Sequence, residues 1–265
     1  MKKNVSISSL FIVHYVLLIL FFYFIPTISK AQSFESLVQE GMRFELASNE
    51  KAALLKYREA QKIKPLDITV LCKCSDLSGN IGAYEKNNSL RDKYFETSLS
   101  FAKIACNNYP KSDEANVSMS IAMGRIALTK SGKDKIELVK GIKEYADNAI
   151  KINPNNAIAW HVLGKWNYEI SNLNFIEKTA VKLIFGALPA ASFQKSINAF
   201  EKAKKLSIGF MQNYLELAKA YKKTGQSKLA INNLNELIKL TPVSENDRIV
   251  LSEAKSILET ISFKQ

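Results

Sequence analysis

One short pattern recurs along the chain: an alanine followed five residues later by a proline. The three copies are Ala60 with Pro65, Ala105 with Pro110, and Ala149 with Pro154. Proline lacks the backbone N–H that a continuing helix needs, so each copy predicts the end of a helix. Repeated endings of one kind indicate stacked copies of one small helical unit, because a single unit cannot bury its apolar face alone.

The first unit shows the pattern in most detail. Its marked positions are Gly41, Phe44, Ala53, Tyr57, Ala60 and Pro65. These offsets match the 34-residue tetratricopeptide pattern. Gly41 and Ala53 are small enough for two helices to cross closely, and Tyr57 fills the space beside them.

The fourth and fifth units repeat this arrangement. The fourth begins with Trp160, Leu163 and Gly164, closes with Phe200 and Ala203, and has Ile208 in the proline position; the fifth has Tyr214, Leu217, Ala218, Tyr221, Ala230 and Pro242. We assign all of these positions, including Trp160 and Gly164, to packing between repeats.

We therefore predict an all-α fold: a tetratricopeptide-repeat, right-handed helical solenoid over residues 32–265. It should contain about five helix-turn-helix units. Residues 244–261 are amphipathic and predict the C-terminal capping helix that such an array needs.

Three units carry insertions between their two helices. Those at 81–91 and 129–140 are polar and predict surface loops or helix extensions. The third, 174–185, is apolar and is followed by Gly186 and Pro189, which predict a helix stop. We expect its large side chains to pack against the array and to close one side of a groove; the alternative is an exposed helix that docks on a membrane or partner. The residues concerned are Phe175, Ile176, Val181, Ile184 and Phe185.

Residues 1–31 have the features of a signal peptide. Lys2 and Lys3 precede an uncharged apolar run over 10–25, and Pro26 ends it. Small residues at Ser29 and Ala31 predict cleavage before Gln32, whereas the length of the run leaves an uncleaved membrane anchor as the alternative. We expect an exported protein of the periplasm or cell envelope, or a secreted one, with membrane contact only through this segment if it is retained.

The formal net charge is +12, but the lysines alternate with glutamates at helical spacing, as on a solvated helix face. We therefore expect no nucleic-acid partner. Cys72, Cys74 and Cys106 form an odd set that predicts small buried thiols and neither a disulfide framework nor a metal site. No catalytic motif or phosphate-binding glycine loop is present, which predicts a protein without enzymatic activity or cofactor.

The fourth unit and its insertion carry a family resemblance. The residues that carry it are Gly164, Tyr168-Glu169, Asn172-Leu173, Glu177-Lys178, Phe185-Gly186, Pro189, Ser192-Phe193, Phe200, Lys202-Ala203, Tyr214, Ala218-Lys219 and Tyr221. Over residues 100–240 the chain resembles the C-terminal repeats of the regulator of microtubule dynamics family. The resemblance implies a helical-repeat fold without catalytic residues; animal members are microtubule- or organelle-associated binding proteins, whereas the predicted export places this chain elsewhere.

A repeat solenoid binds partners on a concave face lined by the first helix of each unit. Counting along the repeats, we expect Arg125, His161, Lys165, Tyr168, Lys219 and Lys222 on this face. The functional interpretation is a groove for a protein or peptide partner; the alternatives are solvated lysines beside a packing tyrosine, and a wall histidine that is already hydrogen-bonded. A second hypothesis is a carrier that holds a lipid or other apolar ligand under the 174–185 helix.

Overall fold

The computed structural model describes residues 32–185 and 190–262 of the 265-residue chain. The predicted signal segment, the predicted stop at 186–189 and the side chains of Ile184 and Phe185 lie outside the described residues. Residues from Phe34 onward form one compact unit.

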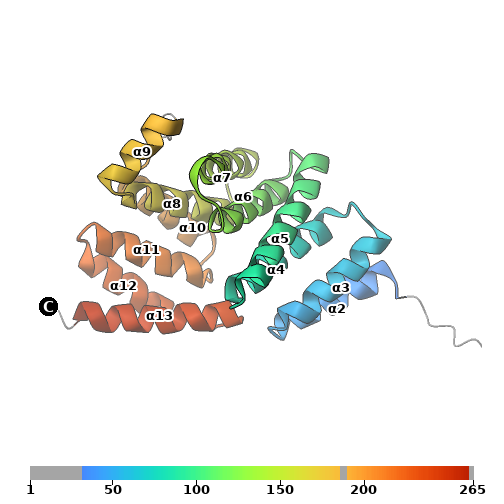
Figure 1. The fold of residues 1–265 in the computed structure, drawn as a ribbon. Coiled ribbons are helices and arrows are strands. Elements are labelled where there is room, and N and C mark those ends of the chain that lie inside the picture. Colours follow the sequence, from blue (N-terminus) through green and yellow to red (C-terminus); the bar gives the residue numbers. More distant parts are fainter. Residues whose placement is uncertain (1–31, 186–189, 263–265) are drawn as a thin grey trace, which may run out of the picture. The chain divides into compact units, whose positions relative to one another are not determined.

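The elements of this unit are helices throughout the described part, in the order shown in Figure 1. They are α2 (Phe34–Leu46), α3 (Glu50–Ile63), α4 (Ile68–Tyr84), α5 (Asn88–Asn108), α6 (Asp113–Ala127), α7 (Gly132–Ile152), α8 (Ala157–Asn172), α9 (Phe175–Phe185), α10 (Phe193–Leu206), α11 (Met211–Lys223), α12 (Ser227–Leu237) and α13 (Glu245–Ser262). The helices pack in five pairs: α2 with α3, α4 with α5, α6 with α7, α8 with α10, and α11 with α12. Helix α13 covers the last pair. The predicted helical-repeat solenoid is confirmed.

The recurring alanine marks the same structural event in four units. The carbonyl oxygens of Ala60, Ala105, Ala149 and Ala203 each accept a hydrogen bond from the backbone N–H four residues later, where the helix ends. In the first three units a proline follows directly, so the helix cannot continue. Ile208 follows in the fourth, which shows that this ending does not depend on proline.

The small residues of the pattern allow close contact between paired helices. A Cβ atom added to Gly41 would lie 2.8 Å from Tyr57 Cζ, and one added to Gly164 would lie 2.6 Å from Phe200 Cδ1. Tyr57 and Phe200 are completely buried. The two rings therefore occupy the space that the glycines leave open.

The insertions of the second and third units are helix extensions. Helix α4 continues to Tyr84 and α5 has 21 residues, while α7 begins at Gly132 and also has 21. The three cysteines are free thiols, buried between helices.

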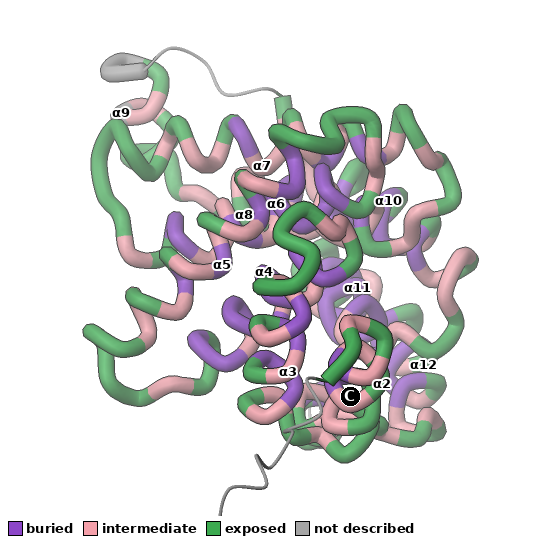
Figure 2. Tube along the Cα trace, turned by 90° about the vertical axis from the view of Figure 1, so that its right-hand side faces the viewer, coloured by how far each residue is buried: buried purple, intermediate pink, exposed green. Residues whose placement is uncertain are grey.

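Helix α9 does not pack as the sequence predicts. Phe175 is 82% exposed and Ile176 is 78% exposed, so our expectation of burial is wrong for both side chains. The helix begins with a reciprocal cap in which Asn174 and Glu177 each accept a backbone N–H from the other. Figure 2 shows no buried residue in the described part of α9, and its packing against another helix is mainly against α7.

Two hydrogen bonds link the beginning of the array to its end. Ser48 Oγ donates to the carbonyl oxygen of Val243 at 3.3 Å, and Tyr84 donates to the amide oxygen of Asn246 at 2.5 Å. Ser48 has a positive φ of 56°, which is unusual for a residue other than glycine. The turn between α2 and α3 and the end of α4 thus lie against the start of α13.

Candidate functional site

From the second pair onward, the first helix of one pair contacts the first helix of the next: α4 contacts α6, α6 contacts α8, and α8 contacts α11. We call the surface that these four helices form the first-helix face. The six residues that the sequence suggests for partner binding all come from three of these helices. Arg125 comes from α6, three come from α8 and two from α11.

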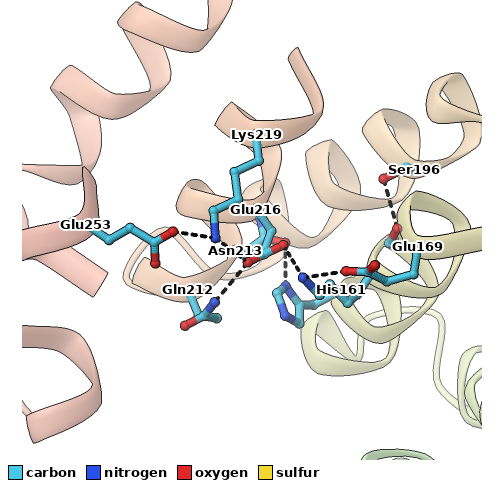
Figure 3. Close-up of polar contacts among 10 residues, drawn as sticks. His161, Glu169, Ser196, Gln212, Asn213, Glu216, Lys219 and Glu253 are labelled. Atoms are coloured by element: carbon cyan, nitrogen blue, oxygen red, sulfur yellow. Dashed lines mark hydrogen bonds and ion pairs between the residues drawn. The ribbon is translucent and has the colours of Figure 1, made fainter. Parts of the chain in front are cut away.

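The centre of the C-terminal half is a carboxylate, Glu216 of α11, between two lysines (Figure 3). Lys165 Nζ lies 2.7 Å from Glu216 Oε2 and Lys219 Nζ lies 3.1 Å from Glu216 Oε1. The Glu216 side chain is only 4% exposed. Lys165 also contacts Glu169 at 3.0 Å, and Lys219 contacts Glu253 of α13 at 2.8 Å.

The electrostatics of this network follow from burial and pairing. Burial acts to raise the pKa of Glu216, but the two lysine ammonium groups outweigh it and hold the pKa below its ordinary value. Burial acts to lower the pKa values of Lys165 and Lys219, and the glutamates raise both above their ordinary values. Both lysines are therefore charged and already paired, so a ligand would have to compete with Glu216 for them.

His161 lies beside this network in an apolar wall. Its ring centroid is 5.5 Å from that of Phe200 and 4.7 Å from that of Phe210. The Asn213 amide nitrogen donates to the Phe200 carbonyl, so its oxygen is the acceptor for His161 Nδ1 at 3.1 Å. Burial lowers the pKa of His161 to about 4. The imidazole is neutral at physiological pH and is held in one orientation.

Tyr168 and Lys222 have different surroundings. The Tyr168 ring packs edge-on against Phe193 of α10, with centroids 5.6 Å apart, and thus contributes to packing. Lys222 is exposed at the C-terminal end of α11. Neither is hydrogen-bonded to Glu216 in the described residues, although Lys165 Nζ lies over the Tyr168 ring, 5.8 Å from its centroid.

The N-terminal half of the face contains a guanidinium without a carboxylate partner. Arg125 Nη2 lies 3.5 Å from Asn80 Oδ1, and no ion pair to Arg125 is found within residues 32–185 and 190–262. Burial lowers the pKa of Arg125 below its ordinary value, although Tyr84, Glu50 and Asp76 act in the opposite sense from a distance. The charged N–H donors of a buried guanidinium normally bind a carboxylate or another strong acceptor.

Asp76 of α4 is the second unusual group of this half. It accepts a hydrogen bond from Ser118 of α6 at 2.9 Å. Burial raises its pKa to about 6, against the effect of the Ser118 hydrogen bond and of Lys73. Lys73 itself is paired with Glu45 at 2.8 Å.

Sequence reasoning did not identify Glu216, Asn213 and Glu253 as members of the site. The available signal is an acid at position 216 that has apolar residues on both sides, Leu215 before it and Leu217 after it. In the part of the chain that the structure covers, no set of three or more His, Cys, Asp or Glu side chains could hold a metal ion. Nor is any described helix long and apolar enough to span a membrane.

Residues 37–262 match the family described as regulator of microtubule dynamics protein 1-3. The chain belongs to this family. Regulator of microtubule dynamics protein 1 of Bos taurus is 25% identical over 234 residues, which are 87% of this chain and 72% of that protein. Protein 2 of Homo sapiens is also 25% identical, over 67% of this chain but only 44% of its own length. The chain thus spans less than half of the family's protein 2.

Solved structures show the same fold at lower identity. A thermophilic TPR protein of Thermus thermophilus superposes with a TM-score of 0.61 at 14% identity, over 84% of this chain and 98% of the other. Yeast Tom70 superposes with a TM-score of 0.56 at 13% identity, over 100% of this chain and 45% of its own. At these identities the likeness establishes the helical-repeat fold of this family member.

Proposed function

We propose that this protein is a non-catalytic scaffold whose first-helix face holds a protein or peptide partner. The observation that carries the proposal is Arg125, a largely buried guanidinium whose hydrogen bond to Asn80 is long and whose remaining donors have no carboxylate partner in the described chain. A peptide offers carbonyl and carboxylate oxygens that fit the planar guanidinium. The paired lysines of the C-terminal half would then supply shape and position, with Arg125 as the anchor.

The test is selection of peptides from a random display library on residues 32–265, followed by affinity measurement. We expect selected peptides to bind Arg125→Ala at least tenfold more weakly, with partial recovery in Arg125→Lys because the charge returns without the fork of donors. Lys255→Ala is the matched control, since Lys255 is an exposed cation on α13. Peptides that bind the Arg125→Ala and Lys255→Ala variants equally well would contradict the proposal.

A second candidate is the carrier of a lipid or other apolar ligand. A pocket of about 500 Å³ lies beneath α9, and its apolar walls come from Ile170, Leu173, Val181 and Phe193. Extraction of the purified protein with organic solvent and mass spectrometry would test it. Val181→Trp should empty the pocket of any co-purified lipid, whereas Phe175→Trp, on the exposed side of α9, should not.

We also propose that residues 1–31 direct export and are removed before Gln32. Expression in the host followed by N-terminal sequencing of the protein tests this step. Recovery of an intact chain starting at Met1 in the membrane fraction would favour the uncleaved anchor instead.

A further inference from the structure

We propose that a second pocket, between α7, α8 and α10, binds a phosphate ester that carries a neighbouring hydroxyl group. The pocket has a volume of about 460 Å³, which is within the range of small-ligand sites. It is lined by Lys143, Trp160, Leu163, Asn167, Ala190, Lys195, Asn198, Ala199 and Lys202. Two of its walls come from the second helices α7 and α10, so the site is separate from the first-helix face and does not rest on the proposed function.

The lining is strongly basic. Lys143, Lys195 and Lys202 line the pocket, and no acidic side chain is among the lining residues. Lys143 is paired with Asp147, and Lys195 Nζ donates to the carbonyl of Ala190 at 2.8 Å, which leaves that ammonium charge uncompensated. Lys202 is exposed and has no ion pair in the described chain. At least two cations thus face a shared space, and their repulsion falls when an anion enters.

The chemistry of the cations favours phosphate over a single carbonyl. Lysine acts as a compact point charge with three donors, and a phosphate group presents several acceptor oxygens to lysines that approach from different helices. Lys143 comes from α7, whereas Lys195 and Lys202 are seven residues apart on α10. Ammonium groups that reach the pocket from two helices can therefore contact different oxygens of one anion.

The lining also contains an unpaired acceptor. Asn167 is 4% exposed; its Nδ2 donates to the Leu163 carbonyl at 2.9 Å, and this bond identifies which terminal atom of the amide is the oxygen. Its Oδ1 is buried without a hydrogen-bond partner in the described structure. Buried polar atoms are nearly always paired, so this atom calls for a donor, and an alcohol hydroxyl reaching it as the side chain adjusts would supply one.

Trp160 completes the pocket with an aromatic wall. Its indole Nε1 donates to the Pro154 carbonyl at 2.9 Å, which fixes the ring. The sequence motif assigns Trp160 to repeat packing, yet the ring is partly exposed, and Trp166 is the buried tryptophan of this helix. The carbon skeleton of a phosphate ester can pack on this ring while its phosphate contacts the lysines.

The experiment uses Trp160 as its reporter. In a Trp166→Phe background, which leaves Trp160 as the one tryptophan, fluorescence and calorimetry are followed on adding glycerol 3-phosphate at low salt. Vesicles of phosphatidylcholine with and without phosphatidylglycerol form the second arm. Saturable binding of both glycerol 3-phosphate and the phosphatidylglycerol vesicles would show that the pocket recognises the phosphate ester itself. Saturable binding of the phosphatidylglycerol vesicles alone would show that the ligand is a lipid headgroup.

Two variants connect the binding to the pocket. We expect the double variant Lys195→Gln/Lys202→Gln to bind at least tenfold more weakly. Lys239→Gln/Lys255→Gln removes the same charge at exposed positions outside the pocket and should change the affinity less than twofold. Asn167→Leu should weaken binding at least fivefold, and circular dichroism should show that each variant is folded. Equal losses in the two double variants, or no saturable response in either arm, would overturn the proposal.

Discussion

Substitution of Gly164 by alanine tests the packing of the repeats most directly. An added Cβ atom would lie 2.6 Å from Phe200 Cδ1, and within 2.9 Å of two further ring atoms. The Phe200 ring is completely buried, so it cannot turn away. Overpacking of a core typically costs about 1–3 kcal/mol, and the higher helix propensity of alanine returns up to about 1 kcal/mol. Because the 2.6 Å contact is with a buried ring, we place the overpacking cost in the upper half of that range, about 2–3 kcal/mol, and expect a net loss of about 1–2 kcal/mol.

The assay is thermal and urea unfolding of residues 32–265. For a chain of this size, 1 kcal/mol corresponds to roughly 2–4 °C in Tm, so Gly164→Ala should lower Tm by about 2–8 °C. Gly124→Ala in α6 is the matched control, because its Cβ would meet Ile142 Cδ1 at an ordinary 3.9 Å. The control should be neutral or stabilising by up to about 1 kcal/mol. A Gly164→Ala protein as stable as wild type would refute the reasoning, and recovery in Gly164→Ala/Phe200→Leu would support it.

Three further outcomes follow from individual side chains. His161 has a folded pKa of about 4 and an unfolded value of about 6.5, so the unfolded state gains the proton first, and stability should fall as pH drops from 6.5 to 4. In urea titrations, the loss of unfolding free energy between pH 6.5 and pH 4 should be about 2–3 kcal/mol smaller in His161→Gln than in the wild type. The pH dependence of stability expected from Asp76 is opposite to that from His161. The folded pKa of Asp76, about 6, lies above its unfolded value, so stability falls as the pH rises and the charged carboxylate is destabilising above pH 6. Asp76→Asn should therefore stabilise by about 1–3 kcal/mol at pH 7.5 and much less at pH 4.5 in the same assay; a constant difference would contradict this assignment. Phe175→Ala should leave the unfolding free energy within about 0.5 kcal/mol, because the side chain is exposed, and calorimetry would reveal any larger loss.

The sequence predicts features of this fold that depend on local structure. The helix ends at Ile63 and Asn108 follow from the missing N–H of Pro65 and Pro110, an effect that acts within one turn. The small residue at Gly41 and the ring at Tyr57 can be paired from spacing alone, because the fourth unit repeats the same crossing with Gly164 and Phe200.

Contacts between units are harder to predict. Lys165 and Glu216 are 51 residues apart, and they meet only because α8 and α11 come together at a particular register. The apolar composition of residues 174–185 likewise predicts a helix, but it does not predict which surface the helix packs against. Phe175 and Ile176 lie in its first turn and remain exposed, so the number of apolar residues alone did not determine burial.

The hydrogen bonds from Ser48 to Val243 and from Tyr84 to Asn246 affect how the repeat array unfolds. A linear array of repeats, each touching only its neighbours, unfolds like a one-dimensional chain that frays from either end. Here the two ends restrain each other across 195 and 162 residues of sequence. Helix α13 also packs on α11 and α12, so fraying of the first pair would remove only the Ser48 contact with the segment before α13. We therefore expect the backbone amides around Ser48 and those around Val243 to exchange their hydrogens together.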